Sequence, residues 1–99
     1  FEGEYLNGKR NGKGKEYKFD KLIFEGEYLN GKRNGKGKEF YKNNKIKFKG
    51  EYLNGKRWNG IGYDRRRKVI YELINGNGKI IEYDKYCNIW YGVIWDKKI

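Results

Sequence analysis

The sequence predicts an all-β protein, an elongated single-layer stack (solenoid) of antiparallel β-hairpin repeats. The first sixteen residues, FEGEYLNGKRNGKGKE, recur without change 23 residues later, at residues 24–39. Each copy holds two Asn-Gly steps, which favour hairpin turns because both residue types tolerate positive φ. No apolar stripe with a 3.6-residue period occurs, and the many glycines would destabilise a helix. These observations together indicate strands connected by tight turns.

The repeat divides the chain into one array of units. A third copy starts at Phe48, with Lys49 in place of a glutamate and an extra Trp58 before its Asn-Gly step. A fourth copy is shortened and begins at Tyr71, which aligns with Gly50, and a fifth stops soon after it starts. The single expected domain, residues 1–99, consists of units 1–23, 24–47, 48–70, 71–89 and 90–99. Because the chain begins inside a unit and without methionine, we expect a segment of a longer protein.

Within a unit, side chains alternate between the two faces of a strand. One face is expected to carry the aromatic rings and Gly3, and the other the charges of Glu2 and Glu4 close to Lys13 and Lys15. Isolated hairpins are marginally stable, so units should stack and align repeated positions in rows, with glycines making room for neighbouring rings. The predicted partner-binding groove is lined by Tyr5, Phe24, Tyr28, Phe48 and Tyr52. The alternative is that these rings, above all the phenylalanines, only pack the core.

The net charge is +11, and residues 71–99 contribute nothing to it. Lys-Arg pairs flank the first Asn-Gly step of each of the first three units, so stacking should align them along one edge of the array. Such an edge attracts phosphates and carboxylates. The predicted basic edge consists of Lys9, Arg10, Lys32, Arg33, Lys56, Arg57, Arg65, Arg66 and Arg67. The alternative is that these exposed charges only keep the protein in solution.

Composition argues against an enzyme. The chain has no His, Ser or Thr and a single cysteine, Cys87, so neither a Ser-His-Asp triad nor a Cys-His pair can form within it. One cysteine without histidine does not suffice for a zinc site. We therefore expect no catalytic residue, no metal site and no cofactor, and we expect Cys87 to act as a small apolar residue. No stretch of about 18 apolar residues and no signal-peptide pattern is present, which favours a cytoplasmic location.

The segment GEYLNGKRNGKGKEY resembles the MORN (membrane occupation and recognition nexus) repeat, whose pattern is roughly YEGEWxNGKxHGxGxYxxxDG. The resemblance is clear for residues 1–64 and looser for residues 68–95. The chain departs from the pattern at Asn11, Asn34 and Asn59, which stand at the usual histidine, and in carrying Tyr at the usual Trp. The resemblance implies a curved hairpin stack that acts as a scaffold, attached in some members to membranes, the cytoskeleton or enzymes.

Together these features predict a non-enzymatic scaffold that binds a peptide or an amphipathic helix of a partner protein along the aromatic groove. The alternative is binding of anionic phospholipids, including phosphoinositides, through the basic edge. Nucleic acid ranks third, because no nucleic-acid motif accompanies the basic charge. Unpaired strands at the ends of the array would also allow a homodimer. The expected location is the cytoplasm, with peripheral attachment to a membrane or the cytoskeleton as a further option.

Overall fold

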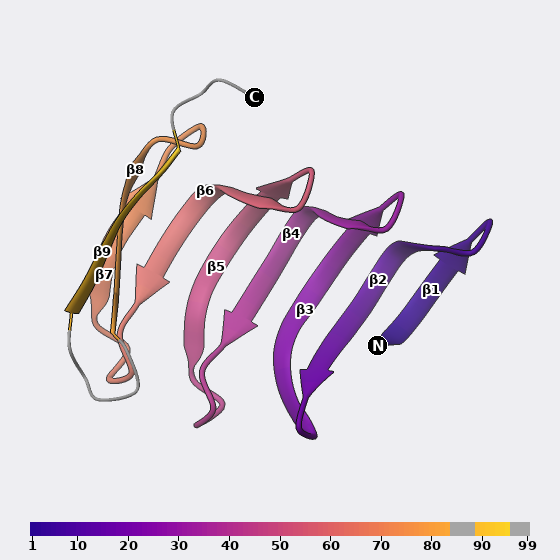
Figure 1. Cartoon of the computed structure of the whole chain (residues 1–99), viewed down its shortest axis with the longest axis horizontal. Coiled ribbons are helices and arrows are strands. Elements are labelled where there is room, and N and C mark those ends of the chain that lie inside the picture. The colour runs from indigo at the N-terminus through magenta and orange to yellow at the C-terminus, as the bar shows by residue number, and fades with distance from the viewer. Residues whose placement is uncertain (84–88, 96–99) are drawn as a thin grey trace.

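The computed structural model describes residues 1–83 and 89–95, and in them it contains nine β-strands and no helix. The strands are β1 (Glu2–Leu6), β2 (Lys9–Lys18), β3 (Lys21–Leu29), β4 (Lys32–Phe40), β5 (Ile46–Leu53), β6 (Lys56–Tyr63), β7 (Val69–Leu73), β8 (Gly78–Tyr83) and β9 (Ile89–Trp95). Strands β1 to β7 form one open antiparallel sheet in chain order, and β8 pairs with β9 (Figure 1). The predicted all-β array of hairpins is thus confirmed. Cys87, which was expected to act as a small apolar residue, lies outside the described residues.

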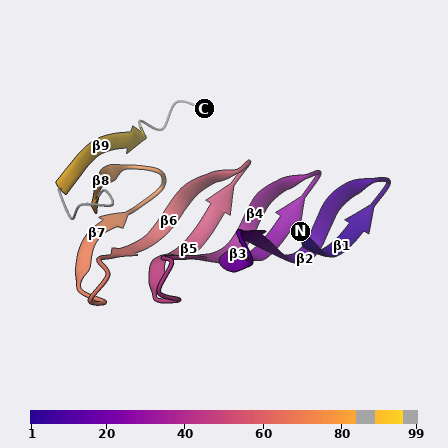
Figure 2. The same cartoon turned by 60° about the horizontal axis from the view of Figure 1, so that its bottom comes forward.

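The molecule is a thin slab, with extents of 41 × 34 × 16 Å. Hairpins do not stack face to face; each pairs edge to edge with the next, so that β2 is bonded to β3 in the same way as to β1. Figure 2 shows the two-stranded sheet of β8 and β9 beside β7, at the end of the large sheet. Strands β1 to β7 therefore form a single layer with two distinct broad faces.

The first Asn-Gly step of each unit forms the hairpin turn, as predicted. Asn7 and Gly8 both have positive φ, 50° and 77°, and Leu6 pairs directly with Lys9. Two-residue turns with this backbone match the right-handed twist of paired strands. The same turn recurs at Asn30-Gly31, Asn54-Gly55 and Asn75-Gly76.

The second Asn-Gly step does not form a turn, contrary to the prediction. Asn11-Gly12 lies inside β2, where Gly3 pairs with Gly14 but Tyr5 pairs with Arg10. The additional residues on β2 form a bulge, and Gly12 takes a φ of 88° there. The step therefore bends a continuous strand instead of ending it.

Each bulge anchors the turn of the following unit. The side-chain oxygen of Asn34 accepts a hydrogen bond from the backbone N–H of Asn54 at 3.1 Å, and Asn59 accepts from Asn75 at 2.7 Å. The turn glycine Gly55 also donates to the carbonyl of Arg33 at 2.8 Å. The asparagines that stand at the histidine position of the repeat pattern thus hold successive hairpins in register.

The fourth unit is aligned differently from the sequence-based expectation. Tyr71 pairs with Gly62, which also pairs with Phe48, so Tyr71 continues the row of phenylalanines. Leu73 pairs with Gly60 and occupies the position at which the other units have glycine. The alignment of Tyr71 with Gly50 was wrong, because the shortened unit lacks two residues within its first strand, after the glycine position: Asn75 follows Tyr71 by four positions, whereas Asn54 follows Phe48 by six.

Candidate functional site

A row of glycines crosses the sheet from β1 to β6. Consecutive strand pairings connect Gly3, Gly14, Gly26, Gly37, Gly50 and Gly60. A Cβ added to Gly37 would lie 2.6 Å from Cζ of Phe24 and 3.0 Å from Cε1 of Tyr52. Rings of the face that carries Phe24, here called the aromatic face, therefore lie directly on glycine backbone. The predicted role of these glycines is confirmed.

The aromatic residues predicted to line a groove are mostly in the core. Phe24 and Phe48 have no exposed surface, and Tyr28 and Tyr52 are each 4% exposed. The rings of Phe24 and Tyr52 meet edge to face with centroids 5.1 Å apart, a favourable geometry. Tyr5, in the first unit, differs from its counterparts because 59% of its surface is exposed. Core packing thus describes four of the five predicted groove residues, and they do not line an open groove.

A glutamate connects the first unit to the second. Glu16, on β2, accepts hydrogen bonds from the hydroxyl of Tyr28 and, at 2.8 Å, from Nε of Arg33. The guanidinium of Arg33 also lies 4.0 Å from the ring centroid of Phe24. Burial works to raise the pKa of Glu16, but the hydrogen bonds from Arg33 and Tyr28 and the charge of Arg33 outweigh it and hold the pKa below its ordinary value. Burial and the neighbouring carboxylate raise the pKa of Tyr28.

The same connection joins the second unit to the third, more tightly. Arg57 donates to both carboxylate oxygens of Glu39, at 2.7 and 2.8 Å, and Tyr52 donates to Glu39 at 2.6 Å. Glu39 is more buried than Glu16, which works to raise its pKa, yet the two-point contact with Arg57 keeps the pKa below its ordinary value. Sequence reasoning missed these glutamates, although both end the identical segments and recur in step with the arginines.

The nine residues predicted to form one basic edge lie on three parts of the sheet. The arginines stack on phenylalanine rings of the aromatic face, with Arg10 over Phe1 at 4.2 Å, Arg33 over Phe24 at 4.0 Å and Arg57 over Phe48 at 5.1 Å. The lysines Lys9, Lys32 and Lys56 begin the strands that follow the Asn-Gly turns. Residues 65–67 lie in the turn between β6 and β7, at the opposite ends of the strands (Figure 1). The three Lys-Arg pairs therefore recur at one end of the strands, as predicted, but residues 65–67 do not extend that edge.

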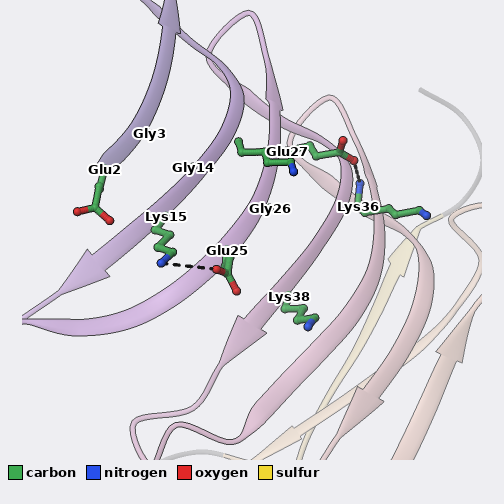
Figure 3. Close-up of a pocket in the computed structure, with 10 residues that line it drawn as sticks. Glu2, Gly3, Gly14, Lys15, Glu25, Gly26, Glu27, Lys36 and Lys38 are labelled. Atoms are coloured by element: carbon green, nitrogen blue, oxygen red, sulfur yellow. Dashed lines mark hydrogen bonds and ion pairs between the residues drawn. The ribbon is translucent and has the colours of Figure 1, made fainter.

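The face opposite the rings carries glutamates and lysines and is here called the charged face. A hollow of about 670 Å³ lies on it across β1 to β4 (Figure 3), and a second of about 430 Å³ continues it to β5. Both contain Glu25, Lys36 and Lys38, and glycine backbone lines them. We call the combined hollow the charged trough; its charged residues are Glu2, Lys13, Lys15, Glu25, Glu27, Lys36, Lys38, Lys49 and Glu51.

Glu2, Lys15, Glu25, Lys38 and Lys49 form a row across the trough, and the charges in this row alternate up to β4 but not at β5. Lys15 pairs with Glu2 on one side and with Glu25 on the other, and its Nζ lies 3.8 Å from the carboxylate of Glu25 (Figure 3). Lys38 pairs with Glu25 on one side but with Lys49 on the other. Like charges directly opposite each other in a sheet are unfavourable. The Lys38–Lys49 pair is therefore a place where an anionic group from outside would be stabilised.

The structure offers no metal centre in the part of the chain that it describes. No group of three or more His, Cys, Asp or Glu side chains there could hold a metal ion. None of the described residues forms a helix long and apolar enough to cross a membrane. The chemistry of the candidate site is thus that of lysine and glutamate side chains beside exposed backbone.

Tandem hairpins joined by a row of paired glycines into one antiparallel sheet define a β-hairpin repeat protein. Residues 1–21 and 24–46 each match the MORN repeat family. Residues 1–46 thus hold two MORN repeats, and modules of this kind generally mediate interactions with proteins or membranes. Comparison with curated proteins and with solved structures gave no match.

Proposed function

We propose that this protein is a non-enzymatic scaffold that binds a segment of a partner protein in the charged trough. The observation that carries the proposal is the trough itself, which is open to solvent, crosses five strands and is lined by lysines and glutamates beside glycine backbone. Charged side chains on an open face can pair with complementary charges of another chain. The rings of the aromatic face, in contrast, pack against one another and against the arginines, so they are not available to a partner. The lack of His, Ser and Thr supports a role without catalysis.

Lys49 determines which partner fits. Glu25 stands at the equivalent position of the second unit, where it completes an alternating row with Lys15. Lys49 replaces that acid, so the mutual repulsion of Lys38 and Lys49 is relieved when a carboxylate lies between them. The partner is therefore an extended or helical segment that presents an acidic side chain to β4 and β5.

The variant Lys49→Glu tests the trough because it restores the alternation of the earlier units without removing any packed group. Partners captured by the wild-type chain at low salt should be lost from Lys49→Glu and should weaken as salt is raised. Lys9→Glu changes the charge equally but lies outside the trough, and it should keep them. A partner that Lys49→Glu and wild type retain equally would contradict this site.

A second candidate function is contact with an anionic membrane, and a specific observation favours it. Phe19, in the turn between β2 and β3, is 86% exposed and has a φ of 50°. A bulky side chain at positive φ is strained, and such strain concentrates at functional positions. The ring is flanked by Lys18 and Lys21, and the Nζ of Lys18 lies 5.9 Å from its centroid.

The same edge of the sheet carries the turns between units, at the lower ends of the strands in Figure 1. Its basic residues are Lys18, Lys21, Lys42, Lys45, Lys47, Arg65, Arg66, Arg67 and Lys68, against the acids Asp20 and Asp64. We call it the interunit edge. Each Lys or Arg near an anionic leaflet contributes about 1 kcal/mol, and an exposed aromatic ring adds apolar contact with the lipid boundary. Such binding would hold the protein at the cytoplasmic surface of a membrane.

Vesicle sedimentation separates this function from the first. Vesicles containing phosphatidylserine should bind the wild-type chain, and those of phosphatidylcholine alone should not. Phe19→Ala and the double variant Lys42→Glu with Lys45→Glu should each weaken binding, whereas Lys9→Glu with Lys32→Glu, at the other edge, should weaken it less. If the two double variants lose vesicle binding equally, the net charge alone attracts the protein to the membrane. That result would count against binding through the interunit edge. Vesicles that contain a phosphoinositide but have the same total charge test whether the protein prefers that headgroup.

A further inference from the structure

At the interunit edge, the tips of neighbouring hairpins separate from one another. The pairing of β3 with β4 ends at Phe24 and Glu39, so residues 21–23 of β3 extend beyond it. The pairing of β5 with β6 ends in the same way, at Phe48 and Gly62. The turns between units therefore lie apart at the lower ends of the strands in Figure 1, and side chains decide what lies between them.

Between the second and third units, this position is filled by a tyrosine of the chain itself. Tyr41 is 8% exposed, and its hydroxyl donates a hydrogen bond to the backbone carbonyl of Tyr63 at 2.7 Å. The charged groups of Arg65 and Lys47 lie 5.5 and 5.7 Å from the centroid of the Tyr41 ring, within the range of a cation–π contact. A phenol ring with one hydroxyl donor thus joins the tip of one unit to the end of β6.

Between the first and second units, the corresponding position is a cavity of about 350 Å³. Its apolar and aromatic lining comes from both tips and consists of Phe19, Leu22, Ile23, Phe40 and Tyr41. The ring of Phe19 does not fill the cavity, because 86% of the surface of this residue is exposed. The cavity is therefore the open counterpart of the place that a tyrosine ring fills one unit later.

The cavity exists because the first turn between units is shorter than the second. β2 ends at Lys18 and β3 begins at Lys21, so a two-residue turn connects them. The second turn starts at Tyr41, whose N–H donates to the carbonyl of Lys45 at 2.9 Å. Two residues after the glutamate that ends each identical segment, the first unit has Lys18 where the second has Tyr41. The first unit thus supplies no tyrosine ring to the space beside its turn.

A ring in the cavity would meet a hydrogen-bond acceptor like the one that Tyr41 uses. Phe40 lines the cavity and pairs with Ile46, just as Tyr63 pairs with Val69 one unit later. The carbonyl of Phe40 therefore stands at the position equivalent to the carbonyl that accepts from Tyr41. A carbonyl oxygen has two lone pairs, so it can accept from a hydroxyl in addition to a bond within the sheet.

The cavity also has cations around it. Lys42 lines the cavity and stands at the position of Arg65, because each is the second residue of a turn that the same backbone hydrogen bond closes. Lys18 and Lys21 line the cavity from the other tip, and among the described residues no acidic side chain lines it. Three lysines around an apolar cavity favour an occupant that carries negative charge beside an apolar group.

We propose that the cavity binds the side chain of a tyrosine from a partner protein, in a segment with acidic residues beside that tyrosine. The ring takes the place that Tyr41 takes one unit later, and its hydroxyl donates to the carbonyl of Phe40. Lys42 lies against the ring, and the acidic neighbours pair with Lys18 and Lys21. This site goes beyond the charged trough, because the two have no lining residue in common.

The first test uses p-cresol, which is the tyrosine side chain alone, and the isotope-labelled 99-residue chain. Titration followed by NMR should show saturable shifts that are largest in residues 18–23 and 40–42. Toluene, which lacks the hydroxyl, should bind about fivefold more weakly, as expected for the loss of one hydrogen bond. Shifts that do not saturate, or equal affinities for the two compounds, would overturn the proposal.

A variant with the longer turn provides the matched control. Residues 17–23 are replaced by the sequence of residues 40–47, FYKNNKIK, which places a tyrosine two residues after Glu16. Because this sequence already forms the turn of the second unit, the variant should fold, and its own ring should fill the cavity and abolish p-cresol binding. Ile23→Trp, which fills the cavity with a different side chain, should have the same effect. Wild-type affinity for p-cresol in both variants would contradict the site.

A peptide distinguishes a partner's tyrosine from a free phenol. A blocked peptide with glutamates on both sides of one tyrosine should bind at the same residues and more tightly than p-cresol, and rising salt should weaken it. The same peptide with lysines in place of the glutamates should bind more weakly. Binding of p-cresol without binding of the acidic peptide would overturn the assignment to a partner protein. Displacement of p-cresol by phosphatidylserine vesicles but not by the acidic peptide would overturn it in favour of a lipid.

These outcomes are separate from those that test the charged trough. Lys49→Glu lies on β5, outside the cavity, and should leave p-cresol binding unchanged. Loss of partners from Lys49→Glu and loss of p-cresol from Ile23→Trp therefore report on two different sites, and failure of one proposal leaves the other standing.

Discussion

Arg33 donates from Nε to the carboxylate of Glu16 at 2.8 Å, across the junction between the first two units and 17 residues apart in the chain. The hydroxyl of Tyr28 donates to the same oxygen, and the guanidinium lies over the ring of Phe24. The aromatic core of each inner unit is therefore completed by its predecessor. In repeat proteins such contacts between neighbours supply much of the stability that a single unit lacks.

Arg33→Ala is expected to lower the free energy of unfolding by about 2 kcal/mol. The variant leaves the half-buried carboxylate of Glu16 without its closest cation and removes the group stacked on Phe24. Urea denaturation followed by tryptophan fluorescence measures the loss. Lys32→Ala, at the exposed neighbouring position, should change stability by about 0.5 kcal/mol or less. Similar effects of the two variants would contradict the role assigned to this contact.

Acid is expected to destabilise the fold through Glu16 and Glu39. Burial works to raise the pKa of each, but hydrogen bonds and charges of the arginines hold it below the ordinary value of 4.5. Because the pKa is lower in the folded state, these carboxylates contribute stability that is present above pH 4.5 and lost as the pH falls through the folded-state pKa. Urea midpoints measured from about pH 7 down to about pH 3 should fall mainly below that value.

The variant Glu39→Gln provides the control for this pH dependence. It should be less stable than the wild type at neutral pH. The neutral amide has one acceptor oxygen, so it cannot accept both of the charge-assisted hydrogen bonds that Arg57 donates to the carboxylate. It should also lose less stability on acidification, since one of the two titrating groups is gone. A variant whose pH profile runs parallel to that of the wild type would show that Glu39 is not responsible.

Gly37→Ala is expected to destabilise the sheet by about 2 kcal/mol through overpacking. The added Cβ would lie 2.6 Å from the ring of Phe24, so the ring or the strand must move. Gly31→Asn is the matched control, because nothing lies within 4 Å of a Cβ at Gly31 and asparagine tolerates the φ of 85° found there. Its cost should be about 1 kcal/mol or less. Thermal unfolding of the two variants measures the difference, and a larger shift for Gly31→Asn would disprove the steric role of the glycine row.

Phe19→Asn is expected to stabilise the fold by about 0.5–1 kcal/mol, because asparagine adopts positive φ at less cost than phenylalanine. The ring of Phe19 is 86% exposed, so little packing is lost with it. Phe19→Ala keeps a residue that disfavours this φ and should not stabilise the protein. Melting temperatures of both variants test the strain, and a less stable Phe19→Asn would show that the ring packs against the protein in solution.

Local features of the sequence predicted the strands and the first turn of each unit, but not that the second Asn-Gly step lies inside a strand. Asn7-Gly8 and its repeats determine where the strands turn, because few other residue pairs adopt two consecutive positive φ values. Alternation then separates Phe1, Gly3 and Tyr5 from Glu2 and Glu4, and the identical copies require the same arrangement in each unit. The row of glycines and the cross-strand pairing of lysine with glutamate follow from these facts.

The surfaces could not be derived in the same way. Lys9 and Arg10 are adjacent in sequence, but as strand residues they point to opposite faces, so their charges do not add up on one edge. The bulge at Asn11-Gly12 changes the register between Tyr5 and Gly3, and a local pattern does not show how many residues a bulge contains. Whether rings such as Tyr28 are open or covered depends on the neighbouring strand, which lies in a different unit.

The sequence by itself therefore determined the repeat, the hairpins, the two chemically different faces and the family, because these depend on turn chemistry and on a period of two residues. Only the tertiary structure decided that the arginines complete the core and that the open surface is a trough of lysines and glutamates. It also decided that residues 65–67 lie on the interunit edge, at the ends of the strands opposite the Asn-Gly turns. The physical reason is that Glu16 and Arg33 meet through strand pairing between units. Burial and charge at these positions are properties of the assembled sheet and not of one hairpin.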